Sequence, residues 1–118
     1  MSNQTPQPIA DISVTELASR LATGTEGLQL VDVRESEEVE TASLNGFENF
    51  PLSQFAEWSP HIHERLDPHV ETLVLCHHGM RSAQMCQWLV NQGFTHVRNI
   101  QGGIHAYAVG VDPTMPRY

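Results

Sequence analysis

The sequence predicts an α/β domain with a mainly parallel central sheet of about five strands flanked by helices. Short apolar segments rich in β-branched residues alternate along the chain with segments that have helical spacing. This alternation is typical of a parallel sheet whose strands are joined by helices. The length of 118 residues and the hydrophobic content of 40% suit one domain with one core.

The strands are predicted where short apolar segments are bounded by turn-forming residues. They cover residues 9–12, 28–33, 47–50, 72–75 and 97–100. The segment at 28–33 reads as a strong central strand and 72–75 as a short buried strand, whereas 9–12 is expected at an edge.

The helices are predicted from caps and from apolar residues at helical spacing. Ser13 and Glu16 have the spacing of a capping box at the start of a helix over 13–22. The other predicted helices cover residues 35–41, 53–66 with an interruption at Pro60, 82–92, and a short segment ending at 108. Gly102 and Gly103 permit a tight turn before that last helix.

Residues 9–110 are expected to form the domain, between a loose N-terminal arm at 1–8 and an extended C-terminal tail at 111–118. The arm carries no signal pattern, and no apolar run is long enough for a membrane span, so we expect a cytoplasmic protein without membrane contact. Two cysteines give no disulfide framework. The net charge of −8 argues against nucleic acid as a partner.

The residues that carry chemistry follow the strand at 72–75. Cys76 stands at the carboxyl end of that strand, and a loop containing Gly79 leads into the next helix. Backbone N–H groups at the start of a helix lack intrahelical partners, and the helix dipole adds positive potential there. This environment stabilises a thiolate and attracts an anion. Arg81 ends the loop, where its guanidinium is expected to close over an oxyanion.

Three segments, in this order, make the chain resemble the single-domain rhodanese family of sulfurtransferases. Cys-His-His-Gly-Met-Arg-Ser at 76–82 is similar to the catalytic loop of the family. Leu-Val-Asp-Val-Arg-Glu at 30–35 is similar to its strand ending in Asp-x-Arg, and Ile-Gln-Gly-Gly-Ile at 100–104 to its Gly-Gly segment. The chain departs from the family at 42–47, where Gly-His-Ile-Pro-Gly-Ala is usual, and at Tyr107, where tryptophan is common.

The resemblance implies a rhodanese-like three-layer fold and a transfer of sulfane sulfur through a persulfide on Cys76. The donor would be thiosulfate or a similar small anion, and the acceptor cyanide or a thiol. No metal or organic cofactor is required. The loop residues are expected to bind the substrate; they are His77, His78, Gly79, Met80, Arg81 and Ser82. The two histidines are expected to contribute mainly their backbone amides.

Several other residues have alternative interpretations. Asp32 and Arg34 point the same way at the end of their strand and are expected to brace neighbouring loops through an ion pair. Cys86 is predicted to pack in the core rather than to act as a resolving thiol. A packing role is also predicted for Trp58 and Trp88. His61, His63 and His69 lie on a polar segment interrupted by proline, which argues against a metal site there.

Three other functions stay open. A cysteine phosphatase or arsenate reductase places five residues between cysteine and arginine, whereas four separate Cys76 from Arg81. A non-catalytic rhodanese-like binding module commonly lacks the cysteine. A persulfide carrier that serves a specific partner protein cannot be separated from a free enzyme by these residues.

Overall fold

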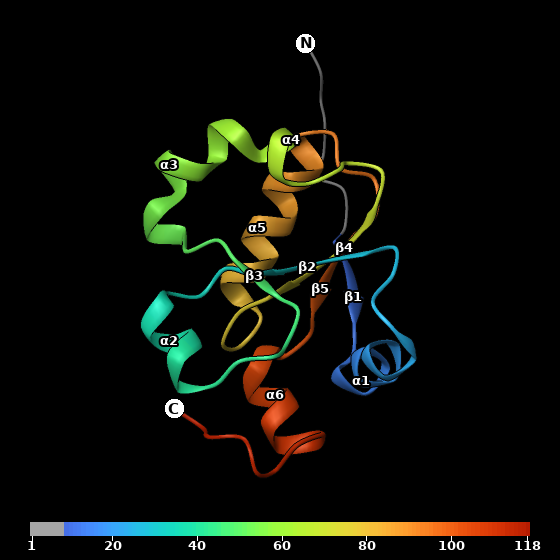
Figure 1. Cartoon of the computed structure of the whole chain (residues 1–118), viewed down its shortest axis with the longest axis vertical. Coiled ribbons are helices and arrows are strands. Elements are labelled where there is room, and N and C mark those ends of the chain that lie inside the picture. Colours follow the sequence, from blue (N-terminus) through green and yellow to red (C-terminus); the bar gives the residue numbers. More distant parts are fainter. Residues whose placement is uncertain (1–8) are drawn as a thin grey trace.

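The computed structural model describes residues 9–118 and contains one five-stranded parallel sheet (Figure 1). The N-terminal arm predicted for residues 1–8 lies outside the described residues. The strands are β1 (Ala10–Ile12), β2 (Leu28–Asp32), β3 (Glu48–Asn49), β4 (Glu71–Leu75) and β5 (Val97–Ile100). Their spatial order is β1-β5-β4-β2-β3, and every pair is parallel. The predicted parallel α/β fold is therefore confirmed, with the 9–12 segment at an edge.

Alternate residues of the central strands enter two different apolar layers. Val31 and Val74 belong to one buried cluster, whereas Leu30 and Leu73 belong to the other. This follows from the two-residue period of a strand, which sends successive side chains to opposite faces. Both faces of β2 and β4 are thus covered, as expected for a parallel sheet.

Helices cover both faces of the sheet, which gives the molecule three layers (Figure 1). The face with Val31 packs against α3 (Phe55–Trp58), α4 (Ile62–Arg65) and α5 (Met80–Asn91). The face with Leu30 packs against α1 (Val14–Thr23) and α6 (Gly103–Gly110). The remaining helix, α2 (Ser36–Thr41), follows β2 directly.

The capping box predicted at the start of α1 is only half formed. The Ser13 hydroxyl accepts a hydrogen bond from the Glu16 N–H at 3.0 Å. The Glu16 carboxylate does not return this bond, because it accepts from Arg98 of β5 at 3.3 Å. A complete capping box stands at the start of α2, where Glu35 and Glu38 exchange these bonds.

The segment at 52–65 consists of short helical turns, in agreement with the interruption predicted at Pro60. Single turns of 3₁₀ helix, η1 (Leu52–Gln54) and η2 (Ser59–His61), precede α3 and α4 respectively. Trp58 is buried and makes edge-to-face contacts with Phe50 and Trp88, at ring-centroid distances of 5.4 and 5.8 Å. The predicted packing role of the two tryptophans is confirmed.

The two helices that frame the Cys76 loop begin after glycines with positive φ. α5 begins at Met80, two residues before its predicted start, and Gly79 precedes it with a φ of 98°. α6 begins at Gly103, after Gly102 with a φ of 78°. No helix within residues 9–118 has both the length and the apolar character needed to cross a membrane.

Candidate active site

Cys76 directly follows β4, at the carboxyl edge of the sheet, and is 1% exposed. Its Sγ accepts a hydrogen bond from the Gly79 N–H at 3.0 Å and another from the Ser82 hydroxyl at 3.1 Å. The first donor lies in the loop and the second in the first turn of α5. A sulfur atom with two such donors, in front of a helix N-terminus, is in an environment that favours negative charge.

Ser82 also links Cys76 to Asn99 of β5. The Ser82 Oγ and the Asn99 Oδ1 are 2.5 Å apart, and the Asn99 side-chain amide donates to the Gly79 carbonyl at 3.1 Å. A hydroxyl has one hydrogen, so Ser82 donates either to the sulfur or to Asn99. With a protonated thiol, the S–H can donate to Ser82 while Ser82 donates to Asn99. With a thiolate, the Ser82 hydrogen turns to the sulfur.

The backbone of the Cys76 loop is fixed against the start of α6. The carbonyls of Cys76 and His77 accept from the N–H groups of Ile104 and His105 at 2.9 and 3.0 Å. Gly103 makes this approach possible, because a Cβ at that position would lie 2.4 Å from the Cys76 carbonyl oxygen. The Gly-Gly segment thus positions the Cys76 loop as well as turning the chain.

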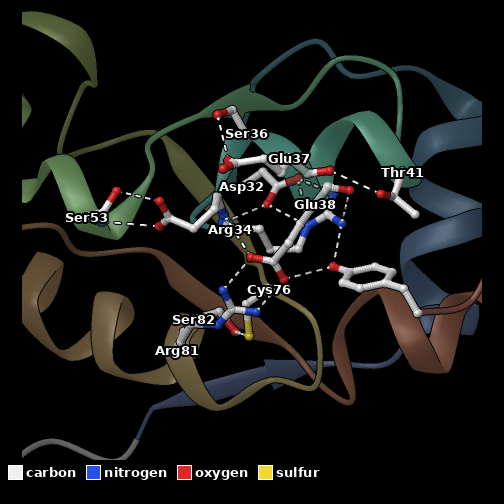
Figure 2. Close-up of polar contacts among 12 residues, drawn as sticks. Asp32, Arg34, Ser36, Glu37, Glu38, Thr41, Ser53, Cys76, Arg81 and Ser82 are labelled. Carbon is white, nitrogen blue, oxygen red and sulfur yellow. Dashed lines mark hydrogen bonds and ion pairs between the residues drawn. The ribbon is translucent and has the colours of Figure 1, made fainter.

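Arg81 points toward Glu38 of α2, as Figure 2 shows, and forms a two-fold ion pair with it. The two nitrogen–oxygen distances are 2.7 and 2.9 Å. The Arg81 guanidinium holds the pKa of Glu38 at about 2, and Glu38 in turn raises the pKa of Arg81. No local feature of the sequence marks Glu38 as the partner of Arg81, because the two residues are 43 positions apart. The guanidinium that was expected over a bound oxyanion is neutralised by this carboxylate.

Asp32 and Arg34 form a buried ion pair beside this site (Figure 2). The Arg34 Nη2 lies 2.7 Å from the Asp32 Oδ2. The same guanidinium donates to the carbonyls of Glu38 and Ala42 and to the Tyr118 hydroxyl. The pair therefore connects the end of β2 with α2, with the residue that follows α2 and with the C-terminal segment.

The last residue of the segment 111–118, which the sequence predicts to be an extended tail, lies beside the site. The Tyr118 hydroxyl donates to Glu38 at 3.1 Å, and its ring stacks on His77 at a centroid distance of 3.9 Å. Tyr118 was not predicted from the sequence, because nothing local marks a tail residue that lies beside a loop 40 residues earlier.

The remaining predicted loop residues differ in exposure. His77 is partly buried, and burial, aided by the neighbouring charge of His78, lowers its pKa. His78 is exposed, and Met80 is 74% exposed. Three rings lie near that of His77: the centroids of His78 and Tyr118 are each 3.9 Å from it, and that of His105 is 6.2 Å from it.

Cys86 and the histidines at 61, 63 and 69 are not part of the Cys76 loop. Cys86 is fully buried in the core, and burial raises the pKa of its thiol to about 12, which confirms the packing role. His61 pairs with Glu64, and His63 bonds to the Gln92 carbonyl. Within residues 9–118, the histidines at 61, 63 and 69 form no group with metal-ligand spacing.

The comparisons with known proteins point to one domain family. Residues 13–109 match the model of the rhodanese-like domain. The chain is 49% identical, over 95% of its length, to the rhodanese-like/PpiC domain-containing protein 12, chloroplastic, of Arabidopsis thaliana, and it spans 38% of that protein. It is 34% identical to a putative sulfurtransferase of Bacillus subtilis, YtwF, with coverage of 84% of this chain and 90% of that protein.

A solved structure of a human single-domain sulfurtransferase, TSTD1, is also similar. It has a TM-score of 0.69 and 26% identity, with coverage of 91% of this chain and 98% of that chain. The match to the family model covers most of the sequence, including all of the residues around Cys76. The chain belongs to the rhodanese-like domain family.

Proposed function

We propose that this domain is a sulfurtransferase that moves a sulfane sulfur from a donor to a thiophilic acceptor through a persulfide on Cys76. The observation that carries the proposal is the position of the Cys76 Sγ, which accepts hydrogen bonds from Gly79 N–H and Ser82 Oγ. These donors stabilise the thiolate before the reaction and again when it is released.

The first half-reaction loads the cysteine. The Cys76 thiolate attacks the outer sulfur of thiosulfate or a similar donor, a new S–S bond forms, and the S–S bond of the donor breaks. Sulfite leaves with the electron pair of the broken bond. In the second half-reaction, cyanide or a thiolate attacks the outer sulfur of the persulfide, and the Cys76 thiolate is released again. The net result is a transfer without any change in the enzyme.

In this proposal, the loop residues form the binding site for the sulfur donor. The Gly79 N–H and the Ser82 hydroxyl already contact the sulfur, and we propose that the backbone N–H groups of His77, His78 and Met80 contact the donor. Arg81 is proposed to steer the anionic donor, although it must share its guanidinium with Glu38. We propose that Asp32 and Arg34 act indirectly, because their contacts hold α2 and therefore Glu38 in place.

A thiol is the acceptor we propose in the cell, carried by a small molecule or by a partner protein. Met80, an apolar side chain that is 74% exposed, is the first residue of α5 and directly follows the loop. An exposed apolar residue next to the reacting group suits contact with a protein that carries the acceptor thiol. A reducing compartment such as the cytoplasm would keep both thiols available.

A phosphatase is a weaker alternative. Four residues separate Cys76 from Arg81, and the guanidinium pairs with Glu38, so it makes no hydrogen bond with the sulfur. A tetrahedral phosphoryl group needs cationic or N–H donors around its three free oxygens. The described site offers a sulfur cradle with two donors.

Intact-mass measurement after incubation with thiosulfate tests the proposal. We expect the unmodified protein and Cys86→Ser to gain one sulfur atom that cyanide removes, and Cys76→Ser to gain none. Aryl phosphate hydrolysis by the same protein should be negligible. An adduct that persists in Cys76→Ser, or efficient phosphate hydrolysis without sulfur uptake, would refute the proposal.

A further inference from the structure

Three histidines meet beside the Cys76 loop, and the proposed sulfur transfer does not use their rings. We propose that His77, His78 and His105 form a binding site for a transition-metal cation that prefers imidazole, with Zn²⁺ as its representative. One ring nitrogen from each residue lies within 4.8 Å of the other two. The ring centroids of His78 and His105 are 4.9 Å apart, and those of His77 and His78 are 3.9 Å apart.

The backbone holds the histidines together independently of their side chains. His105 lies in the first turn of α6, and its N–H donates to the carbonyl of His77 at 3.0 Å. Gly103 permits this contact, since a Cβ there would lie 2.5 Å from the same carbonyl oxygen. The distance between the loop and the helix is therefore fixed before any ion binds, which lowers the entropy cost of assembling the ligands.

A second observation points to a ligand at this cluster. The Nε2 of His77 is buried and has no hydrogen-bond partner among the described residues. A buried polar atom without a partner destabilises the folded state, and such atoms are rare in folded proteins. Tyr118 stacks on the ring with an interplanar angle of 7°, which limits how the ring can turn. A cation bound to this nitrogen would satisfy it.

The donor set decides which cations fit. Three imidazoles suit Zn²⁺, Cu²⁺ or Ni²⁺, whereas Mg²⁺ and Ca²⁺ require oxygen ligands. Zn–N bonds of about 2.0–2.1 Å in a tetrahedral site place the nitrogens about 3.3 Å apart. The exposed His78 ring can rotate to close the present spacing. Three protein ligands would leave one coordination position for water or another small ligand.

Titration calorimetry with Zn²⁺ on protein without a histidine tag tests this site, together with the visible absorption of Co²⁺ as a probe of coordination. We expect one ion per chain and an absorption spectrum of four-coordinate Co²⁺ with nitrogen ligands. His105→Ala and His78→Ala should each weaken binding by about tenfold or more, because each removes a ligand. His69→Ala is the matched control, since His69 is exposed on a turn and lies outside the cluster.

Circular dichroism shows whether each variant is folded, and two histidine variants at separate elements guard against a local folding defect. Cys76→Ser, titrated in parallel, separates the histidine site from metal capture by the reactive thiol. Absence of Zn²⁺ binding by the unmodified protein would overturn the proposal. So would binding that survives both histidine substitutions, or binding that Cys76→Ser abolishes while His105→Ala preserves it.

Discussion

Cys76 and Cys86 are equally buried, but their surroundings differ in chemistry. Cys76 is 1% exposed and Cys86 is 0% exposed, and both belong to the same apolar cluster. Cys76 has two hydrogen-bond donors on its sulfur, whereas Cys86 sits within α5 among core side chains. From this comparison we expect the hydrogen-bond donors around the sulfur, rather than burial alone, to decide how reactive each thiol is.

The largest expected difference between the two thiols is in alkylation. Burial raises the pKa of Cys86 to about 12, so at pH 8 about one Cys86 side chain in 10,000 is a thiolate. We expect iodoacetamide to label Cys76 at least about a hundredfold faster than Cys86 in the native protein. Peptide mass spectrometry after timed quenching measures both rates. Comparable rates would show that the donors around Cys76 have no effect on its reactivity.

Removing one hydrogen-bond donor from the Cys76 sulfur should make its surroundings more like those of Cys86. Ser82→Ala deletes the hydroxyl that bonds to the sulfur at 3.1 Å. A hydrogen bond to a charged group contributes about 1.5–3 kcal/mol, so sulfur transfer should slow by about tenfold to a hundredfold. Thiosulfate:cyanide kinetics measure the loss. Ser36→Ala, at an exposed position in α2, is the control and should react at the unmodified rate.

Arg81 tests whether charge in the wider surroundings of Cys76 contributes to donor binding. Arg81→Ala should raise the KM for thiosulfate by about threefold to tenfold, and Arg81→Lys should recover part of this. Arg81→Ala also leaves Glu38 unpaired, which would repel an anion. The double variant Arg81→Ala/Glu38→Gln removes that repulsion. We expect its KM to stay raised; a return to the unmodified KM would show that Arg81 only shields Glu38.

The smallest expected effect concerns stability near Cys76. The pKa of Glu38 is lowered from 4.5 to about 2, so its ion pair stabilises the folded state above pH 4.5 and loses this contribution as the pH falls toward 2. Glu38→Gln should therefore cost about 1 kcal/mol at pH 7 and progressively less below pH 4.5. Urea unfolding at pH 3, 4, 5 and 7 measures the difference. A difference that does not change with pH would contradict the assignment.

The sequence made the strands and the Cys76 loop predictable because their signals are local. Apolar runs, Gly79 and the cysteine all lie within one strand–loop–helix unit. The partners of that loop come from distant segments: Glu38 is 43 positions from Arg81, and Asn99 is 17 positions from Ser82. Their positions depend on strand order and loop length, which composition and periodicity do not specify.

The dependence on strand order also explains why the sequence did not predict the cluster of His77, His78 and His105. His61, His63 and His69 are close in sequence and were therefore considered as metal ligands. The histidine that lies beside His77 and His78 in the structure is His105. The parallel sheet places the ends of β4 and β5 at one edge, so residues that follow these strands become neighbours. A list of the residues that follow each strand would have included His105.

The contact between the Cys76 loop and α6 has a consequence for the order of biosynthesis. The carbonyls of Cys76 and His77 are held by N–H groups of Ile104 and His105, which a ribosome adds nearly 30 residues later. While the chain is growing, the cysteine therefore emerges before its loop can form these two backbone hydrogen bonds. The order of synthesis therefore delays the folding of the Cys76 loop until the first turn of α6 has also been made.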